Sequence, residues 1–523
     1  MLKYSLFVLF FMSLVQMTIA QKVEVNISPE YRLEQNESIQ AHLDSDVTGH
    51  YVYFFEQRRT FSSESTMYIT KYDNNFEELW SYDYLLENDN VVTYGLQAVN
   101  EKFIWLISEE DNKNTLEYSL IPIDREGEIG QKVKVNTVKF KHRRDGPAVD
   151  WAVSEDSTKI AVVHTFDRNL QRSDFEYNVA VLDDDLNKIW SQQILLGKSE
   201  SQVDVLSSVI GNDGAHYMLV KEYETKNLKE TKKRKDRRGK KEKVAAYDLK
   251  IYKLGQGMDQ PEVLMLDVNE KFARGASLKV AENGDITCVG MFSNLRRGNI
   301  NGVYYLKMNS KGEPITSNIK SFSSIDLEYL GKRNTDKDRS GKEGIEGFFN
   351  FGDQLILSDG SVVVTAEENF NRTISDMRGN FTTTFYSNDI VVILLDSDGT
   401  ITSIKLIPKR QSFYTDIFLS HVAMAVDGKG VYFFYNDDKD NMDRDFGKRP
   451  KAMSTMRDCV TACAHLDMDG NITRKALLDN KDLKMLLLTN VSKRVNENTM
   501  FFAGQGFRTI GKSNFRIGTI ELK

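Results

Sequence analysis

Arginines in the links between predicted strands are the residues of this chain best suited to chemistry. The guanidinium group carries a fixed fork of donors that fits carboxylate, sulfate and phosphate groups. Arginine also prefers exposed loops to strands in general, so an ordinary solvated surface stays open beside a binding role. Lysine shows a weaker bias toward the same links, which favours binding. The candidate ligand-binding residues are Arg58, Arg59, Arg143, Arg144, Arg296, Arg297, Arg372, Arg449 and Arg508.

A titratable pair, His142 and Asp145, flanks two of these arginines. A histidine beside a cationic clamp could act as the general base of an enzyme. The sequence gives catalysis no independent support, because it contains neither a Gly-x-Ser-x-Gly elbow nor a glycine loop for phosphate. We therefore expect no catalytic residue and no cofactor. If the protein is an enzyme instead, His142 and Asp145 are the candidate catalytic residues.

The densest basic segment covers residues 226–243 and holds eleven basic and three acidic residues. Its net charge is +8 in a chain of net charge −7, so the remaining residues carry −15. Such a run predicts either a solvated loop without a specific partner or an electrostatic arm for an anionic partner.

Two groups of potential metal ligands lack the spacing that a metal site or a disulfide needs. Residues 436–443 carry oxygen ligands at alternate positions, as calcium loops do, but Gly447 stands where the bidentate glutamate belongs. Cys459 and Cys463 lie four apart on one predicted strand, which separates their Cα atoms by roughly 13 Å, whereas a disulfide needs under about 7 Å. Cys288 lies in another repeat. We expect no metal site and three cysteines packed as small core residues.

The elements that carry these residues repeat along the chain. Eight strand-like apolar runs each end in a tight turn, usually at an Asp or Asn, at steps of about 51 to 87 residues. Second and third strands of each repeat are apolar on both faces, whereas fourth strands alternate as half-solvated edges do. This anatomy predicts an all-β fold, a single closed β-propeller of eight four-stranded blades, with seven blades as the alternative. The clear turns lie at residues 72–75, 123–127, 182–185, 308–312, 395–399 and 466–470, and the weaker ones at 254–257 and 520–523.

The two ends of the chain complement each other. Residues 1–20 read as a signal peptide, with a basic start, an apolar stretch and a small-residue cleavage site. No later stretch approaches the eighteen apolar residues of a membrane span. Residues 22–27 form a strand without a partner before it, and the last repeat lacks a fourth strand. We expect this N-terminal strand to complete the last blade of a propeller domain over residues 21–523.

The links of such a blade emerge on two faces. Short turns join the first strand to the second and the third to the fourth on one face, which we call the turn face. The other links emerge on the opposite face, which we call the loop face. Insertions gathered on one side of a repeat array usually mark its binding side. The long loops predicted there cover residues 223–244, 322–347, 370–386 and 437–457.

The cadence of an Asp turn followed by a tryptophan appears at Asp73…Trp80 and at Asp183…Trp190. In this the chain resembles the eight-bladed propellers of the pyrroloquinoline-quinone-like family. That family includes quinone dehydrogenases and non-catalytic scaffolds of the bacterial envelope. Its cofactor-binding residues have no match here, so the resemblance implies the fold and an envelope location rather than a chemistry.

Taken together, these patterns predict an exported, non-catalytic binding or scaffold propeller of a bacterial cell envelope, periplasmic or extracellular. Its arginine-rich loop face would engage an anionic glycan, a lipid headgroup or an acidic envelope protein. The export signal argues against nucleic acid as a partner, although the basic run alone would suggest it. The alternative is an exported enzyme that acts on an anionic polysaccharide.

Overall fold

The architecture is taken from a computed structural model of the chain. The described residues are 23–34, 37–57, 65–86, 91–112, 115–139, 147–165, 174–225, 231–235, 241–269, 271–296, 298–322, 344–345, 347, 349–375, 381–426, 428–455, 458–506 and 513–523.

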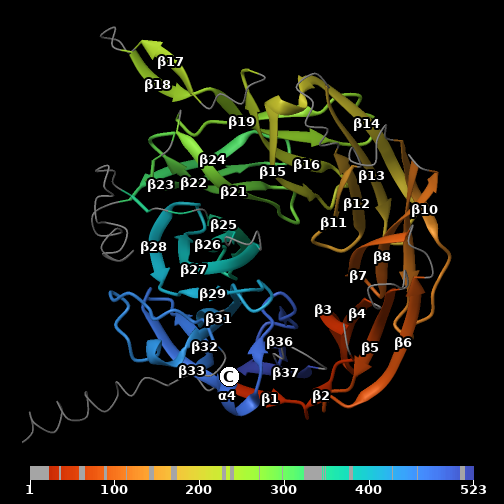
Figure 1. Cartoon of the computed structure of the whole chain (residues 1–523). Helices are drawn as coiled ribbons and strands as arrows, with labels where there is room; N and C mark the ends of the chain where they lie inside the picture. The colour runs from red at the N-terminus through yellow and green to blue at the C-terminus, as the bar shows by residue number, and fades with distance from the viewer. Residues whose placement is uncertain are drawn as a thin grey trace, which may run out of the picture.

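The chain forms a ring of eight antiparallel sheets (Figure 1). Seven sheets hold four main strands in sequence order, and the eighth combines both ends of the described chain. First strands of neighbouring sheets contact one another, as β15 and β21 do. The first strands therefore line the centre of the ring, and the fourth strands form its rim. This is an eight-bladed β-propeller, as the repeats predict, and the seven-bladed alternative is wrong.

The blades follow one another along the chain. The first four blades contain β3 (Glu37–Asp46), β4 (Gly49–Gln57), β5 (Ser65–Tyr72) and β6 (Glu78–Leu86); β7 (Val91–Val99), β8 (Lys102–Asn112), β9 (Thr115–Ile123) and β10 (Val133–Lys139); β11 (Ala148–Val153), β12 (Lys159–Thr165), β13 (Asp174–Asp183) and β14 (Lys188–Ser199); and β15 (Val203–Ile210), β16 (His216–Tyr223), β19 (Tyr247–Leu254) and β20 (Glu262–Leu266). The next three contain β21 (Phe272–Val280), β22 (Ile286–Ser293), β23 (Gly302–Met308) and β24 (Pro314–Ser321); β25 (Phe349–Ile356), β26 (Val362–Ser375), β27 (Phe381–Leu395) and β28 (Ile401–Ile407), with β29 (Gln411–Phe413) beside β27; and β30 (Val422–Val426), β31 (Gly430–Asp438), β32 (Cys459–Leu466) and β33 (Ile472–Asp479). Blade 8 contains β34 (Leu486–Leu487), β36 (Thr499–Gln505), β37 (Asn514–Leu522) and β1 (Val23–Ile27), with β2 (Tyr31–Arg32) and β35 (Lys493–Arg494) at its margins. Helix is confined to the short segments η2 (Glu200–Gln202), η3 (Lys439–Asn441) and α4 (Asn480–Leu483) in the described residues.

The turns between third and fourth strands explain the repeated Asp and Asn residues. In the turns that begin at Asp73, Asp124, Asn309 and Asp396, one side-chain oxygen accepts backbone N–H groups two and four residues further along, at 2.7–3.1 Å. This side-chain bonding fixes a tight turn without help from distant residues. The repeat signal in the sequence is therefore turn chemistry.

Strand β1 completes blade 8, as predicted from the unpaired strand at each end. It runs antiparallel to β37, from Val23 opposite Leu522 to Ile27 opposite Gly518. Just beyond it, the Ser28 N–H donates to the Ile517 carbonyl oxygen at 2.8 Å. The added strand covers the outer edge of β37, which would otherwise present unpaired backbone groups.

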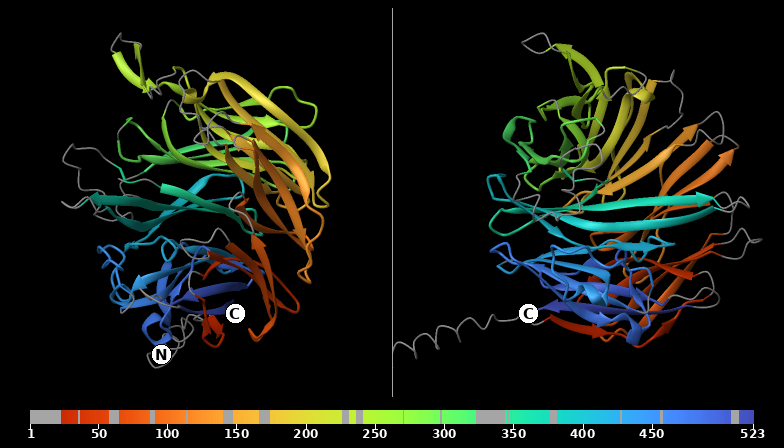
Figure 2. Two further views of the ribbon diagram at one scale, coloured as in Figure 1. Left: turned by 45° about the vertical axis from the view of Figure 1, so that its right-hand side comes forward. Right: turned by 60° about the vertical axis from the view of Figure 1, so that its left-hand side comes forward.

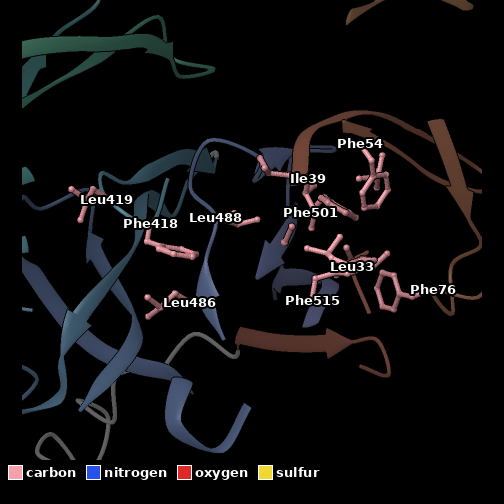
Figure 3. Packing of buried hydrophobic residues seen from close by; sticks show 14 of the residues in the cluster. Leu33, Ile39, Phe54, Phe76, Phe418, Leu419, Leu486, Leu488, Phe501 and Phe515 are labelled. Atoms are coloured by element: carbon pink, nitrogen blue, oxygen red, sulfur yellow. The ribbon is translucent and has the colours of Figure 1, made fainter. Parts of the chain in front are cut away.

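The seam between blades 8 and 1 buries a large apolar cluster (Figure 3). Phe515 of blade 8 meets Phe54 of blade 1 edge-on, with ring centroids 5.5 Å apart. Phe501 joins the same cluster, which extends to Phe418 and Leu419 in the link between blades 6 and 7. That link is therefore anchored in the core although it lies on the loop face.

Trp80 and Trp190 occupy equivalent places, as their spacing predicts. Each is the third residue of a fourth strand, β6 or β14, and each follows a register shift in the pairing with the third strand. Trp190 is buried, and its Nε1 donates to the Gly214 carbonyl oxygen of the next blade at 3.0 Å. Trp80 is only partly buried. The equivalence confirms the register of the repeat.

Two stretches expected to be loops contain hairpins instead. Strands β26 and β27 are 14 and 15 residues long and continue past their blade, so most of residues 370–386 is paired. Cross-strand contacts sustain this extension: the Thr373 and Thr383 hydroxyls lie 2.8 Å apart, and the Phe370 and Tyr386 rings stack at 4.7 Å.

The second hairpin lies in the basic segment, where β17 (Thr231–Lys235) pairs with β18 (Lys241–Ala245). It projects from the body of the ring (Figure 2). Within the described residues, no helix has the length and apolar character that crossing a membrane requires.

Candidate functional site

The predicted arginines divide between two parts of the chain. Arg296, Arg372 and Arg449 are described, and each is exposed. They lie in the second-to-third-strand links or strand ends of blades 5, 6 and 7, hence on the loop face. The other predicted site residues fall outside the described part of the chain: Arg58, Arg59, Arg143, Arg144, Arg297, Arg508, His142 and Asp145.

A cavity of about 570 Å³ opens where blades 6, 7 and 8 meet on the loop face. Its size falls within the range of roughly 300–1,000 Å³ that is usual for ligand pockets. Its lining comes from the start of β25, the extended β26–β27 hairpin, the link that precedes β30, and the turn after β34. None of the predicted site residues lines it, although Arg372 directly follows the lining residue Asn371.

A β-bulge in blade 6 lies next to Asn369, a residue of the cavity lining. Glu367 lies opposite Ile390, but Asn369 lies opposite Ser387, so Asn388 and Asp389 together face the single Glu368. Bulges bend a strand and re-aim its side chains, and they recur beside functional sites. Here the bulge marks the boundary between the blade proper and the hairpin that extends over the loop face.

A buried ion pair lies beneath the cavity. Lys409 is fully buried and Glu367 nearly so, and the Lys409 ammonium donates to the Glu367 carboxylate. Its other two donors bond the Ser387 hydroxyl oxygen at 2.9 Å and the Gln411 amide oxygen at 2.8 Å. All three ammonium protons are thereby used, as a buried cation requires.

Both partners of this pair keep their charge. Burial alone would raise the pKa of Glu367, but the adjacent Lys409 ammonium outweighs it and holds that pKa well below its usual value. Burial lowers the pKa of Lys409, and the Glu367 charge opposes that shift. The shift of Lys409 points toward neutrality, yet its three donated bonds favour the ammonium form.

The same carboxylate fixes the link that walls the cavity. The Ser420 hydroxyl donates to Glu367, and the Ser420 N–H donates to the Gln411 amide oxygen at 2.9 Å. Ser420 adopts a φ of 79°, a conformation that non-glycine residues adopt only where their surroundings hold them. The next residue, His421, places its Nδ1 3.2 Å from the Glu367 carboxylate. Two lining residues are thus held in fixed positions from behind.

Asn436 ties this region to blade 8. Its amide nitrogen donates to the carbonyl oxygens of Phe418, at 2.9 Å, and Leu487, at 2.8 Å. Its amide oxygen accepts the Leu487 N–H at 3.0 Å, and its backbone carbonyl accepts from Gln411 at 2.6 Å. A continuous, fully buried hydrogen-bond network therefore joins blades 6, 7 and 8 below the cavity.

Residues 436–443, which resemble a calcium loop in sequence, fold as the end of β31 followed by η3. Asp437 is buried, and one of its carboxylate oxygens accepts from the Asn441 amide at 2.7 Å. Asp438 and Asp440 instead pair with the Lys451 ammonium, at 3.1 and 2.7 Å. Asp437 and Asp438 are therefore buried and do not belong to a solvated loop. Within the described ranges, no three His, Cys, Asp or Glu side chains are placed to share a metal ion.

The three cysteines are buried and free. Burial raises the pKa of each thiol to about 12, so the thiols stay protonated. A buried, protonated thiol is inert toward oxidation and metals. Cys288, Cys459 and Cys463 accordingly act as core residues.

Sequence reasoning missed the ion pair and the cavity. Glu367 ends an apolar run, Val362-Val363-Val364-Thr365-Ala366, where a strand buried on both sides has no reason to carry a charge. That local conflict was the available signal. Its partner Lys409 lies 42 residues later, in the link between β28 and β29, and no spacing rule connects them.

Comparison with known proteins finds only distant likenesses. No family model matches the chain, and no curated protein matches it. Among solved structures, the chain is similar to the WD40 domain of SCAP from fission yeast, with 9% identity, a TM-score of 0.39, and coverage of 95% of this chain and 98% of that one. It is also similar to Sqt1 from Chaetomium thermophilum, with 9% identity, a TM-score of 0.39, and coverage of 96% and 100%. Prolyl oligopeptidase B from Galerina marginata is covered over 55% of its length and 90% of this chain, at 11% identity and a TM-score of 0.37. Likenesses this distant say nothing about ligands or activity.

Proposed function

We propose that this protein is an exported, non-catalytic binding or scaffold propeller of a bacterial envelope, which engages an anionic ligand or partner through its loop face. One observation carries the proposal, the asymmetry between the two faces. On the turn face, short turns join the strands. The loop face bears both projecting hairpins, β17–β18 and the end of β26–β27, together with the cavity. Projections gathered on one side of a repeat array favour binding there.

Charge supports an anionic partner. Arg296, Arg372 and Arg449 are exposed on three neighbouring blades of the loop face. The β17–β18 hairpin belongs to the basic segment of residues 226–243, whose net charge is +8. A segment with this charge attracts anions at long range.

Binding to defined polyanions tests the proposal. A sulfated polysaccharide, polyglutamate and vesicles of phosphatidylglycerol serve as probes, with dextran and phosphatidylcholine vesicles as neutral controls. Each probe is measured at low and at high salt, because exposed charges are screened beyond about 8 Å at physiological ionic strength. The variants are Arg296→Glu, Arg372→Glu and Arg449→Glu, singly and together. Lys311→Glu, an exposed lysine of the turn face, is the matched control.

We expect salt-sensitive binding to at least one polyanion, weakened by each arginine reversal and unaffected by the lysine reversal. Equal losses in all single variants would indicate a non-specific effect of net charge and contradict a binding face. Release of reducing ends from the sulfated polysaccharide by the purified protein would instead favour the enzyme alternative. Detection of the mature N-terminus after export from a bacterial host tests the location.

A further inference from the structure

The cavity at blades 6, 7 and 8 has chemistry different from that of the surrounding loop face. Among the described residues that line it there is no arginine and no lysine, and the one acidic residue is Asp416. Arginines occur close by but not in the lining. An anionic ligand would therefore meet a carboxylate and no fixed cation, which disfavours its entry.

The cavity offers many unused hydrogen-bonding groups. The side-chain amides of Asn350, Asn371 and Asn490 line it, and none has a hydrogen-bond partner among the described residues. Each amide carries both a carbonyl acceptor and two N–H donors. Amides of this kind can bond two adjacent hydroxyl groups at once, donating to one and accepting from the other. The exposed Asp416 adds a further acceptor.

Aromatic residues supply the apolar part of the lining. Phe370, Phe385 and Tyr386 line the cavity, and Phe370 is 40% exposed. Phe370 and Tyr386 stack with ring planes 10° apart, which holds both rings in place on the hairpin. Flat, fixed rings give contact area at low entropic cost.

Hydrogen bonds and ion pairs behind the lining hold part of it in place. Ser420 and His421 are held by Glu367, and Glu367 by Lys409. A site whose walls are fixed before the ligand arrives loses little freedom on binding. The Nδ1 of His421, a residue of the lining, lies 3.2 Å from the Glu367 carboxylate.

We propose that this cavity binds an uncharged saccharide. Free amides and a carboxylate would bond the hydroxyl groups, and the aromatic rings would contact the C–H faces of the sugar. This site is independent of the proposed polyanion binding, because it uses different residues and a different kind of interaction.

An extended peptide is the competing ligand class. Beyond Phe349 opposite Glu368, β26 has no β25 partner along its inner edge, so a peptide strand could pair there. Strand addition takes most of its specificity from pockets for alternate side chains. This lining instead presents free side-chain amides, which favours a ligand rich in hydroxyl groups.

Saturation-transfer NMR and calorimetry on the full mature protein test the proposal. The panel contains neutral hexoses, N-acetylhexosamines and their oligosaccharides, hexuronic acids, and an equimolar mixture of extended random peptides. We expect a neutral sugar to bind with little dependence on salt. Asn371→Ala and Asn490→Ala should each weaken it about three- to ten-fold, the usual worth of one or two hydrogen bonds. Asn498→Ala, which changes an exposed asparagine of the turn face, should leave it unchanged.

Melting curves of each variant show whether the fold is intact, so a loss of binding in a folded variant is interpretable. The proposal is overturned if no neutral sugar binds, if both cavity variants bind as the wild type does, or if uronic acids or peptides bind in preference. Because the Arg296, Arg372 and Arg449 reversals should not affect sugar binding, failure here is distinct from failure of the polyanion proposal.

Discussion

Removing one partner of the buried pair beneath the cavity should destabilise the protein far more than removing one partner of a surface pair. Lys409 has a fully buried side chain, and Glu367 is 3% exposed. In Glu367→Gln the shape is retained, but the Lys409 charge is left buried and uncompensated. Such losses cost about 3–5 kcal/mol of unfolding free energy.

A surface pair gives the matched control. Glu109 and Lys132 lie 2.6 Å apart, with side chains 36% and 43% exposed. Glu109→Gln removes the same charge from the same kind of pair, and solvent screening limits its cost to about 0–1 kcal/mol. The double variant Glu367→Gln with Lys409→Met removes the buried charge altogether, so it should recover part of the loss.

Urea unfolding followed by tryptophan fluorescence measures these differences. The lowered pKa of Glu367 also fixes the pH dependence. Its carboxylate stabilises the native state above its unfolded pKa of about 4.5, and that contribution fades as the pH falls below this value. The difference in unfolding free energy between the wild type and Glu367→Gln should therefore be largest at neutral pH and become smaller in acid. If Glu367→Gln costs no more than Glu109→Gln at neutral pH, the reasoning about an uncompensated buried charge is refuted.

Three further outcomes follow from the fold. A protein that begins at residue 29 should melt many degrees below one that begins at Val23, because it uncovers the edge of β37 and part of its core face; equal calorimetric transitions would contradict the closure. Trp190→Ala should cost about 3–5 kcal/mol in urea unfolding, and Trp80→Ala clearly less, because only Trp190 is buried. Burial raises the pKa of Asp437 from 3.8 to about 6, so the native state binds this proton more tightly than the unfolded state does. The unfolding free energy of the wild type should therefore fall by about 3 kcal/mol as the pH rises from 3.8 to about 6. Asp437→Asn should abolish this part of the slope, and parallel pH profiles of the two proteins would speak against it.

The sequence was sufficient for the ring but not for its cavity, for a physical reason. Blade architecture is encoded locally: Asp73 or Asp396 bonds backbone groups within four residues, and alternation within a strand shows which side is buried. Even the closure by β1 could be inferred, because an unpaired strand at each end is visible without knowing any distance.

The cavity depends instead on contacts between links that are remote in sequence. Asn436 looks like the first oxygen ligand of an acidic loop, yet in the fold its amide bonds Phe418 and Leu487. The pairing of Glu367 with Lys409 likewise joins residues that no local pattern connects. Local rules assign such residues to loops, since only the assembled blades bring their partners within reach.

The pairing of β1 with β37 has a consequence for how the protein folds. The two strands are separated by nearly the whole chain, and Glu24 of β1 forms an ion pair with Lys523, which follows β37, across 499 positions. Bringing together the ends of a flexible chain of that length costs about 5–6 kcal/mol in loop-closure entropy, from (3/2)RT ln n. Seven blades can form from neighbouring segments first, and each one formed shortens the remaining gap. Zipping of β1 onto β37 is therefore the natural last step of folding, and its reversal is the natural first step of unfolding. Amide hydrogens of β1 that pair with β37 should then exchange faster than those in the inner strands of the other blades.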